Sequence, residues 1–220
     1  MPKLFYILQI FVAFFCFGKQ EDFDPMLPIK TEINIGENII LPPDILIGDL
    51  NAPVKIIDYS SFSCLHCCHA YRDILMPLYD EYIKSGKVLL ALREFPLDRF
   101  SMDSSIAIKC YEKFAHEQSL DADIHNVVSD LFEYSNMPEK SFSPNDFLHM
   151  RAKQNGIKIT KAQMQSCAED KKIENMILCS KFFAIRYLGI NGTPAIYING
   201  MRYKGPMLKK DIKSKIDSML

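Results

Sequence analysis

Two cysteines separated by two residues, Cys64 and Cys67, are the side chains of this sequence whose type and spacing best suit chemistry. They follow a β-branched run at 54–57 and open a long amphipathic segment, which predicts a strand-to-helix junction. The first N–H groups of a helix lack partners and, with the helix dipole, favour an anion. Thiols at such positions have pKa values of roughly 3.5–7.5. Cys64 is therefore the predicted thiolate nucleophile of a redox site.

The segments around these cysteines are predicted to position them. Residues 45–60 read as two strands joined by a turn at 48–53, and residues 71–84 continue the helix, with Pro77 kinking it. The apolar run at 87–95 predicts a buried strand. A strand, a crossover helix and a second strand form a βαβ unit, so the two strands are expected to be parallel.

The rest of the chain is predicted to be helical before it returns to strands. Residues 101–188 show only helical spacing, with Ser143 and Pro144 suited to an N-cap and a first helical position. Strands are expected at 195–199 and near 201–204. A last helix is expected to place four apolar residues on one face: Leu208, Ile212, Ile216 and Leu220. The predicted fold class is α/β, a small mixed sheet interrupted by an all-helical insertion.

Composition fits a globular domain. The chain has 220 residues, 48% of them apolar and 24% charged, which suffices for a full core in one domain or in one domain with an insertion. A net charge of −1 gives no reason to expect a nucleic-acid partner.

The N-terminus has the pattern of a secretory signal. Lys3 precedes fourteen uncharged residues at 4–17, and Gly18 is followed by a polar run at 19–22. A charged start, an apolar stretch and a small-residue exit predict a signal peptide over 1–18, and hence export to the bacterial periplasm, where disulfides persist. The alternatives are a buried helix or a permanent anchor.

Residues 19–44 are predicted to form an N-terminal extension. They hold four of the twelve prolines and no sustained periodicity, apart from one short strand expected near 39–41. The extension is interpreted as a linker or as an arm through which the protein forms oligomers.

Three features together carry a family resemblance. They are the run Cys64-Leu65-His66-Cys67, the run Gly192-Thr193-Pro194 just before the returning strand, and Asp58 in the strand ahead of the cysteines. With these features the sequence resembles the thioredoxin-fold disulfide oxidoreductases, and among them the DsbA family. The resemblance implies a thioredoxin-like fold with an inserted all-helical domain, its first half at 45–97, the insertion at 98–188 and its second half at 189–220.

The resemblance implies a role for each residue at the cysteine pair. Cys64 would attack and form a mixed disulfide, and Cys67 would close the redox-active disulfide or resolve the intermediate. His66 between them would stabilise the Cys64 thiolate; the alternative is an ordinary surface histidine.

The other family positions lie in the strands and the returning loop. Pro194 would form a cis-peptide bond facing the cysteines, the alternative being a trans turn proline. The backbone of Thr193 would pair with substrate as an added strand. Asp58 would be the buried acid that exchanges protons with Cys67, or else an aspartate that caps a loop.

Two residues depart from the family pattern. Leu65 replaces the proline common beside that histidine, which affects the redox potential. Cys68 extends the motif, and it is interpreted either as a buried spectator thiol or as a thiol that reshuffles with Cys64.

The cysteines outside the active pair leave the pairing open. Four such cysteines allow three full pairings. Exported relatives carry a second, structural disulfide in the insertion, and by that resemblance Cys110 is expected to pair with Cys167 while Cys179 stays free.

The predicted function is that of an exported thiol:disulfide oxidoreductase which forms disulfides in reduced secreted proteins, needs no cofactor or metal, and is re-oxidised by a membrane partner. A disulfide isomerase or reductase acting on misfolded proteins is the alternative within the fold. A copper-delivering protein of the same fold would use the cysteines with His116, His125 or His149. A binding module without catalysis is the last alternative.

Overall fold

The computed structural model describes residues 33–35, 38–40, 44–120 and 123–220. The predicted signal peptide at 1–18 lies outside the described residues, as does most of the extension at 19–44. Within that extension, β1 (Ile33–Ile35) and β2 (Asn38–Ile40) pair in antiparallel fashion, close to the single short strand expected near 39–41.

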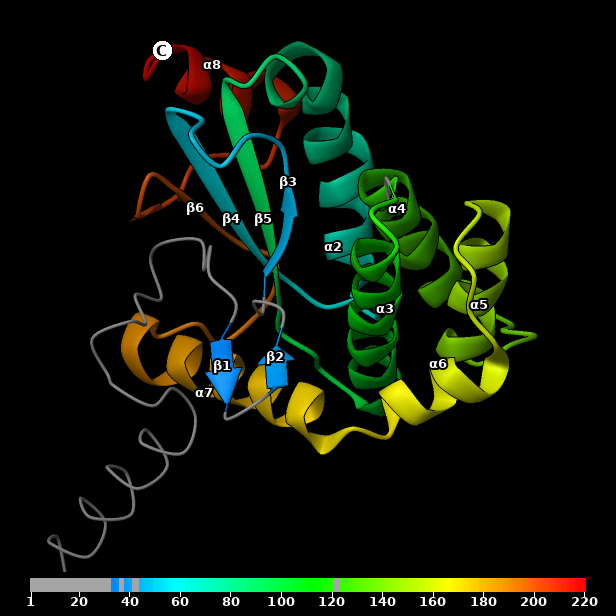
Figure 1. Ribbon diagram of the computed structural model, residues 1–220. Coiled ribbons are helices and arrows are strands. Elements are labelled where there is room, and N and C mark those ends of the chain that lie inside the picture. Colours follow the sequence, from blue (N-terminus) through cyan, green and yellow to red (C-terminus); the bar gives the residue numbers. More distant parts are fainter. Residues whose placement is uncertain (1–32, 36–37, 41–43, 121–122) are drawn as a thin grey trace, which may run out of the picture.

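A five-stranded mixed sheet forms the centre of the fold (Figure 1), with its strands in the order β3-β5-β4-β6-β7. The central strands β4 and β5 are parallel, as the predicted βαβ unit requires, and the other pairs are antiparallel. The strands are β3 (Asp44–Ile47), β4 (Val54–Ser60), β5 (Val88–Glu94), β6 (Ala195–Ile198) and β7 (Met201–Arg202).

The helix after the cysteines changes its hydrogen-bond pattern along its length. It begins as α2 (Leu65–Ala70), continues through a π-helical turn at Tyr71–Leu75 and a 3₁₀ turn at Met76–Leu78, and ends in a second π-helical turn at Tyr79–Ile83. Pro77 lies in the 3₁₀ turn, so the expected irregularity is present. Its cause is the missing N–H of proline.

Most of the remaining helices gather beside α2 and its continuation (Figure 1). Ser143 caps α5 with Pro144 at its first position, as predicted. The remaining helices are α3 (Arg99–Glu117), α4 (Ile124–Ser135), α5 (Pro144–Gln154), α6 (Lys161–Ala168), α7 (Lys171–Leu188) and α8 (Lys209–Asp217). In the described part of the chain, none of the helices has both the length and the apolar character needed to span a membrane.

The sheet is covered on both faces, because side chains of successive strand residues point to opposite sides. Ile56 and Leu90 contribute to the larger core under α2, α3 and α8. Ile57 and Ala91 pack in a smaller core with Ala184 of α7. The helix α7 thus packs on the sheet itself, and the predicted end of the insertion at residue 188 stays a prediction.

The last helix buries only the middle of its predicted apolar face. Ile212 and Ile216 are fully buried, but Leu208 and Leu220 are about half exposed. Leu208 precedes the first turn and Leu220 follows the last one, so neither side chain lies over the sheet.

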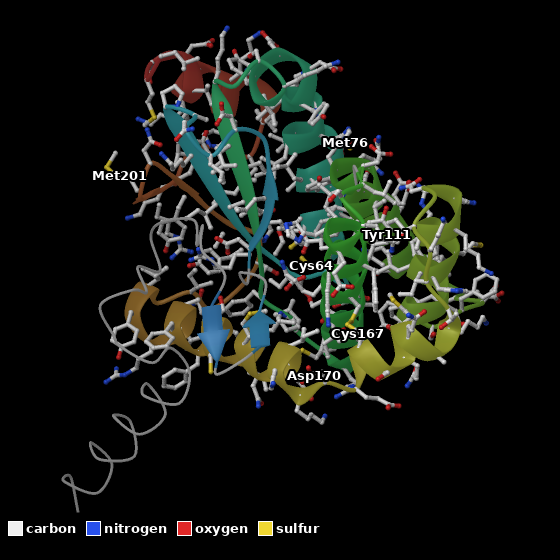
Figure 2. The ribbon with its side chains drawn as sticks, viewed as in Figure 1. Cys64, Met76, Tyr111, Cys167, Asp170 and Met201 are labelled. Carbon is white, nitrogen blue, oxygen red and sulfur yellow. A yellow bond between two sulfur atoms is a disulfide. The ribbon has the colours of Figure 1, made fainter. Side chains whose placement is uncertain are left out.

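Three cysteines of the helical region are disulfide-bonded. Cys110 on α3 and Cys167 on α6 form a disulfide, with their Cα atoms 5.9 Å apart (Figure 2). Cys179 on α7 is also disulfide-bonded. The expectation that Cys179 stays free is therefore wrong; sequence spacing carries no information on which thiols a fold brings together.

Candidate active site

Cys64 is the N-cap residue of α2. Its N–H donates to the carbonyl of Ser61 at 3.0 Å, and its sulfur accepts the N–H of Cys67 at 3.3 Å. The sulfur thus occupies the position where a helix N-terminus favours negative charge. Cys64 is partly exposed at the end of the sheet, near the middle of the molecule (Figure 2).

Cys67 lies one turn further on and is fully buried. Both thiols of the pair are free in this structure. Burial raises the pKa of the Cys67 thiol, and the nearby Asp58 carboxylate raises that pKa further. Cys64 is therefore the accessible thiol and Cys67 the buried thiol that holds its proton, which suits Cys64 to attack and Cys67 to respond.

The loop before β6 meets the cysteines from a distant part of the chain. The Thr193–Pro194 peptide bond is cis, and the Cys64 thiol donates to the Thr193 carbonyl with an S···O distance of 3.6 Å. Residues 129 positions apart in the sequence are therefore in contact. The residue before Pro194 thus contacts Cys64, and the roles of Thr193 and Pro194 stay predictions.

Asp58 lies inside β4 and is completely buried, so it does not cap a loop. The Ser60 hydroxyl donates to Asp58 Oδ2 at 2.6 Å. Burial raises the pKa of the Asp58 carboxyl to about 7, although this hydrogen bond partly opposes the shift. A carboxyl with this pKa can accept or release a proton near neutral pH.

The neighbours of the pair fall on different sides of α2. His66 is exposed and Leu65 is 54% exposed, so both lie on the accessible side. Cys68 is buried in the larger core, and burial raises the pKa of its thiol. This placement suits the spectator interpretation of Cys68, and its role stays a prediction.

The comparison with known families covers nearly the whole described fold. The family model described as thioredoxin matches residues 41–218. The chain belongs to the thioredoxin family.

Solved structures relate this thioredoxin-family chain to DsbA proteins. Alpha-DsbA1 of Wolbachia pipientis has a TM-score of 0.65 and 28% identity, covering 81% of this chain and 92% of that chain. BdbD of Bacillus subtilis has a TM-score of 0.66 at 20% identity, covering 80% and 92%; this second likeness concerns the fold. The predicted resemblance to DsbA proteins and the thioredoxin-like fold with a helical insertion are confirmed.

Relatives of this thioredoxin-family chain are named for disulfide chemistry. A Rickettsia conorii protein, named as a protein-disulfide oxidoreductase, is 22% identical over 177 residues, which are 79% of this chain and 58% of the relative. A Bacillus cereus protein, named as disulfide bond formation protein D, is 25% identical over 154 residues, 70% of this chain and 69% of the relative. The chain thus matches less than two thirds of the length of the rickettsial relative.

A groove of about 570 Å³ runs beside the thioredoxin-family cysteine pair. Of the residues that line this groove, the sequence predicted only His66 and Pro194 as site residues. The prediction did not include the segment before α8, which forms one wall of the groove. The exposed pair Met207-Leu208, directly after Pro206, was the available signal. The lining residues are His66, His69, Ala70, Asp73, Ile74, Pro194, Met207, Leu208 and Lys209.

The histidines considered for copper lie away from the pair or are engaged elsewhere. His149 is buried with Nε2 3.1 Å from the Ile159 carbonyl oxygen, His125 stacks on Tyr79, and His116 lies in the last turn of α3. Across the residues that the structure describes, no three His, Cys, Asp or Glu side chains converge as metal ligands would. The copper interpretation gains no support from this geometry.

Proposed function

We propose that this chain is an exported thiol:disulfide oxidoreductase that forms disulfides in reduced secreted proteins. One observation carries the proposal: a partly exposed thiol at a helix N-terminus touches the cis-Pro loop, while its partner one turn away is buried beside an acid. The names of its relatives supply independent support.

The oxidative reaction starts from a Cys64–Cys67 disulfide. A substrate thiolate attacks the Cys64 sulfur, so a substrate–Cys64 disulfide forms and the bond to Cys67 breaks. Cys67 leaves with the electron pair and takes a proton from Asp58. A second substrate thiolate then attacks the sulfur of the first, which forms the substrate disulfide and releases Cys64 as a thiolate.

The cis-Pro loop and the groove would hold the substrate. The Thr193 backbone lies against Cys64, where an extended peptide can add as a strand. The groove offers apolar contacts at Ile74 and Leu208, with Asp73 and Lys209 as charged partners. Reduced proteins with exposed, extended cysteine segments are therefore the proposed substrate class.

His66→Ser is expected to make the protein a weaker oxidant. His66 is exposed between the cysteines, where a positive imidazole stabilises the reduced, thiolate form of Cys64. We expect the equilibrium constant with glutathione to change by at least about tenfold, or about 30 mV. His116→Ser, an exposed change on α3, is the matched control; an unchanged equilibrium constant in His66→Ser would contradict this role.

Parallel assays on ribonuclease test the proposed function. An oxidase re-oxidised by a membrane partner will restore activity to reduced ribonuclease faster than to scrambled ribonuclease. Light scattering on the same sample will then give the mass of a monomer. Faster rescue of scrambled ribonuclease by an oligomer would instead indicate an isomerase. N-terminal sequencing of the secreted form tests export through residues 1–18.

A further inference from the structure

A second buried acid, Glu94, ends β5 near the active site. Its side chain is 2% exposed, and neither of its carboxyl oxygens has a hydrogen-bond partner among the described residues. Asp58 Oδ1 is buried without a partner in the same way. Buried polar atoms are nearly always paired with protein or with ordered water, so atoms of this kind indicate an internal water site.

Glu94 and Asp58 lie on the same face of the sheet. In the parallel β4–β5 pair, Ser60 is opposite Glu94 and Asp58 is opposite Leu92. Residues opposite each other share a face, and so do residues two apart on one strand. The two acids are therefore diagonal neighbours on adjacent strands, and Ser60 between them donates its hydroxyl to Asp58.

A buried cation on α3 acts on Glu94 through its charge. Lys109 of α3 is 2% exposed and donates to Glu112 Oε2 at 2.8 Å, and the Glu112 side chain is 18% exposed. Burial raises the pKa of Glu94 well above its ordinary value, while the charge of Lys109 opposes this shift. Glu94 is thus suited to hold a proton and to pass it on.

The other charged groups near Glu94 are bound in a separate pair. Asp44 of β3 accepts two hydrogen bonds from Arg93, at 2.5 and 2.7 Å. Arg93 precedes Glu94 on β5 and so points to the opposite face of the sheet. Asp58 and Ser60 share the face of Glu94 on β4, and Lys109 and Glu112 of α3 act on Glu94 through their charges.

Cys67 and Asp58 are both fully buried, so a proton on Asp58 has no direct contact with solvent. We propose that Glu94 is a proton-relay residue, which exchanges the proton of Asp58 with solvent through one internal water and the Lys109–Glu112 pair. This inference rests on the proposed function and adds the route by which its buried acid passes on the proton of Cys67.

The relay moves one proton and changes no bond between sulfur atoms in the exchange reaction. When reduced protein attacks a disulfide, the Cys64 thiolate displaces one thiolate and forms a mixed disulfide. Cys67 then gives its proton to Asp58 and attacks the Cys64 sulfur, which releases the second thiolate. In the same step the water passes a proton from Asp58 to Glu94, and Glu94 releases one proton toward Glu112, so the second thiolate leaves only as fast as this proton transfer occurs.

Dithiobis(nitrobenzoate), whose released thiolate is coloured, separates these steps. Stopped-flow absorbance of the reduced active pair will show one thiolate released by Cys64 and a second released by Cys67. All variants carry Cys68→Ala so that only the active pair reacts. A wild-type chain that released one thiolate alone would contradict the proposed function itself, whereas the relay concerns only the rate of the second release.

We expect Glu94→Gln, which keeps the shape and removes the exchangeable proton, to slow the second release at least tenfold across pH 6–8 and to leave the first unchanged. In an Asp58→Asn background the same change should have no further effect. Glu117→Gln, an exposed change on the same helix as Glu112, should alter neither phase.

Three results would overturn the relay: an unchanged second release in Glu94→Gln, equal slowing of both releases, or equal slowing with and without Asp58. If Glu94→Gln does not fold, as judged by thermal unfolding, Glu112→Gln takes its place. That variant should slow the second release at least threefold, and a wild-type second release in it would overturn the relay.

Discussion

Cys64→Ala is expected to lose disulfide exchange, with a rate lowered on the order of 10³-fold or more. Cys64 is the partly exposed thiol of the pair, whereas Cys67 is buried and burial raises the pKa of its thiol. With Cys64 removed, no accessible thiol of the pair is left to attack a substrate. Oxidation of a reduced two-cysteine peptide, followed by fluorescence or mass spectrometry, measures the loss.

Cys67→Ala and Cys68→Ala separate the roles of the neighbouring thiols. Cys67→Ala should still attack but should accumulate a mixed disulfide that survives non-reducing electrophoresis, because the resolving thiol is gone. Cys68→Ala should keep the wild-type exchange rate, since its thiol points into the core. Retained exchange in Cys64→Ala, or a loss in Cys68→Ala equal to that in Cys64→Ala, would contradict the assignment.

Asp58→Asn is expected to stabilise the protein at alkaline pH while it slows the Cys67 step. The folded state raises the pKa of Asp58 from 3.8 to about 7. Below pH 3.8 both the folded and the unfolded chain hold the proton, so Asp58 costs no stability there. Between pH 3.8 and about 7 the unfolded chain ionises first, and stability falls by roughly 4 kcal/mol over about three pKa units.

An amide at this position carries no charge at any pH, so Asp58→Asn removes this loss. We expect the variant to exceed the wild type in free energy of unfolding at pH 8 by up to about 4 kcal/mol, and to gain little at pH 4. Urea unfolding at the two pH values measures the difference. The exposed Asp80→Asn is the matched control, and an equal gain at both pH values would contradict the assignment of the titration to Asp58.

The same variant should exchange disulfides more slowly. Asn cannot accept the Cys67 proton, so resolution of the mixed disulfide should fall about 10²-fold near pH 7, while the first attack by Cys64 stays as in the wild type. Opposite effects on stability and on rate distinguish a functional buried acid from one that merely packs.

Local features of the site were predictable from the sequence because they depend on neighbours in the chain. The Cys-x-x-Cys spacing after a β-branched strand placed Cys64 at a helix N-terminus, and Pro77 marked the irregular helix beyond it. The parallel β4–β5 pair followed from the strand–helix–strand order. The contact between Cys64 and Thr193 required the family resemblance, since no local pattern joins these residues.

Burial of polar groups was not predictable in the same way. The apolar run at 88–92 indicated a buried strand, but nothing in it indicated that Arg93 and Glu94, which end the same strand, are buried too. Arg93 is buried because Asp44 and Tyr59, from two other strands, meet its guanidinium. Leu208, expected on the apolar face of the last helix, is half exposed beside the groove instead.

The sequence by itself thus determined the redox pair, its place at a helix start and the order of the elements, because hydrogen bonding within a few residues and side-chain periodicity decide these. Only the tertiary structure decided which acids are buried beside Cys67, which cysteines meet and which surfaces form the groove. Desolvation and disulfide pairing depend on residues far apart in the chain, and packing alone brings such residues together.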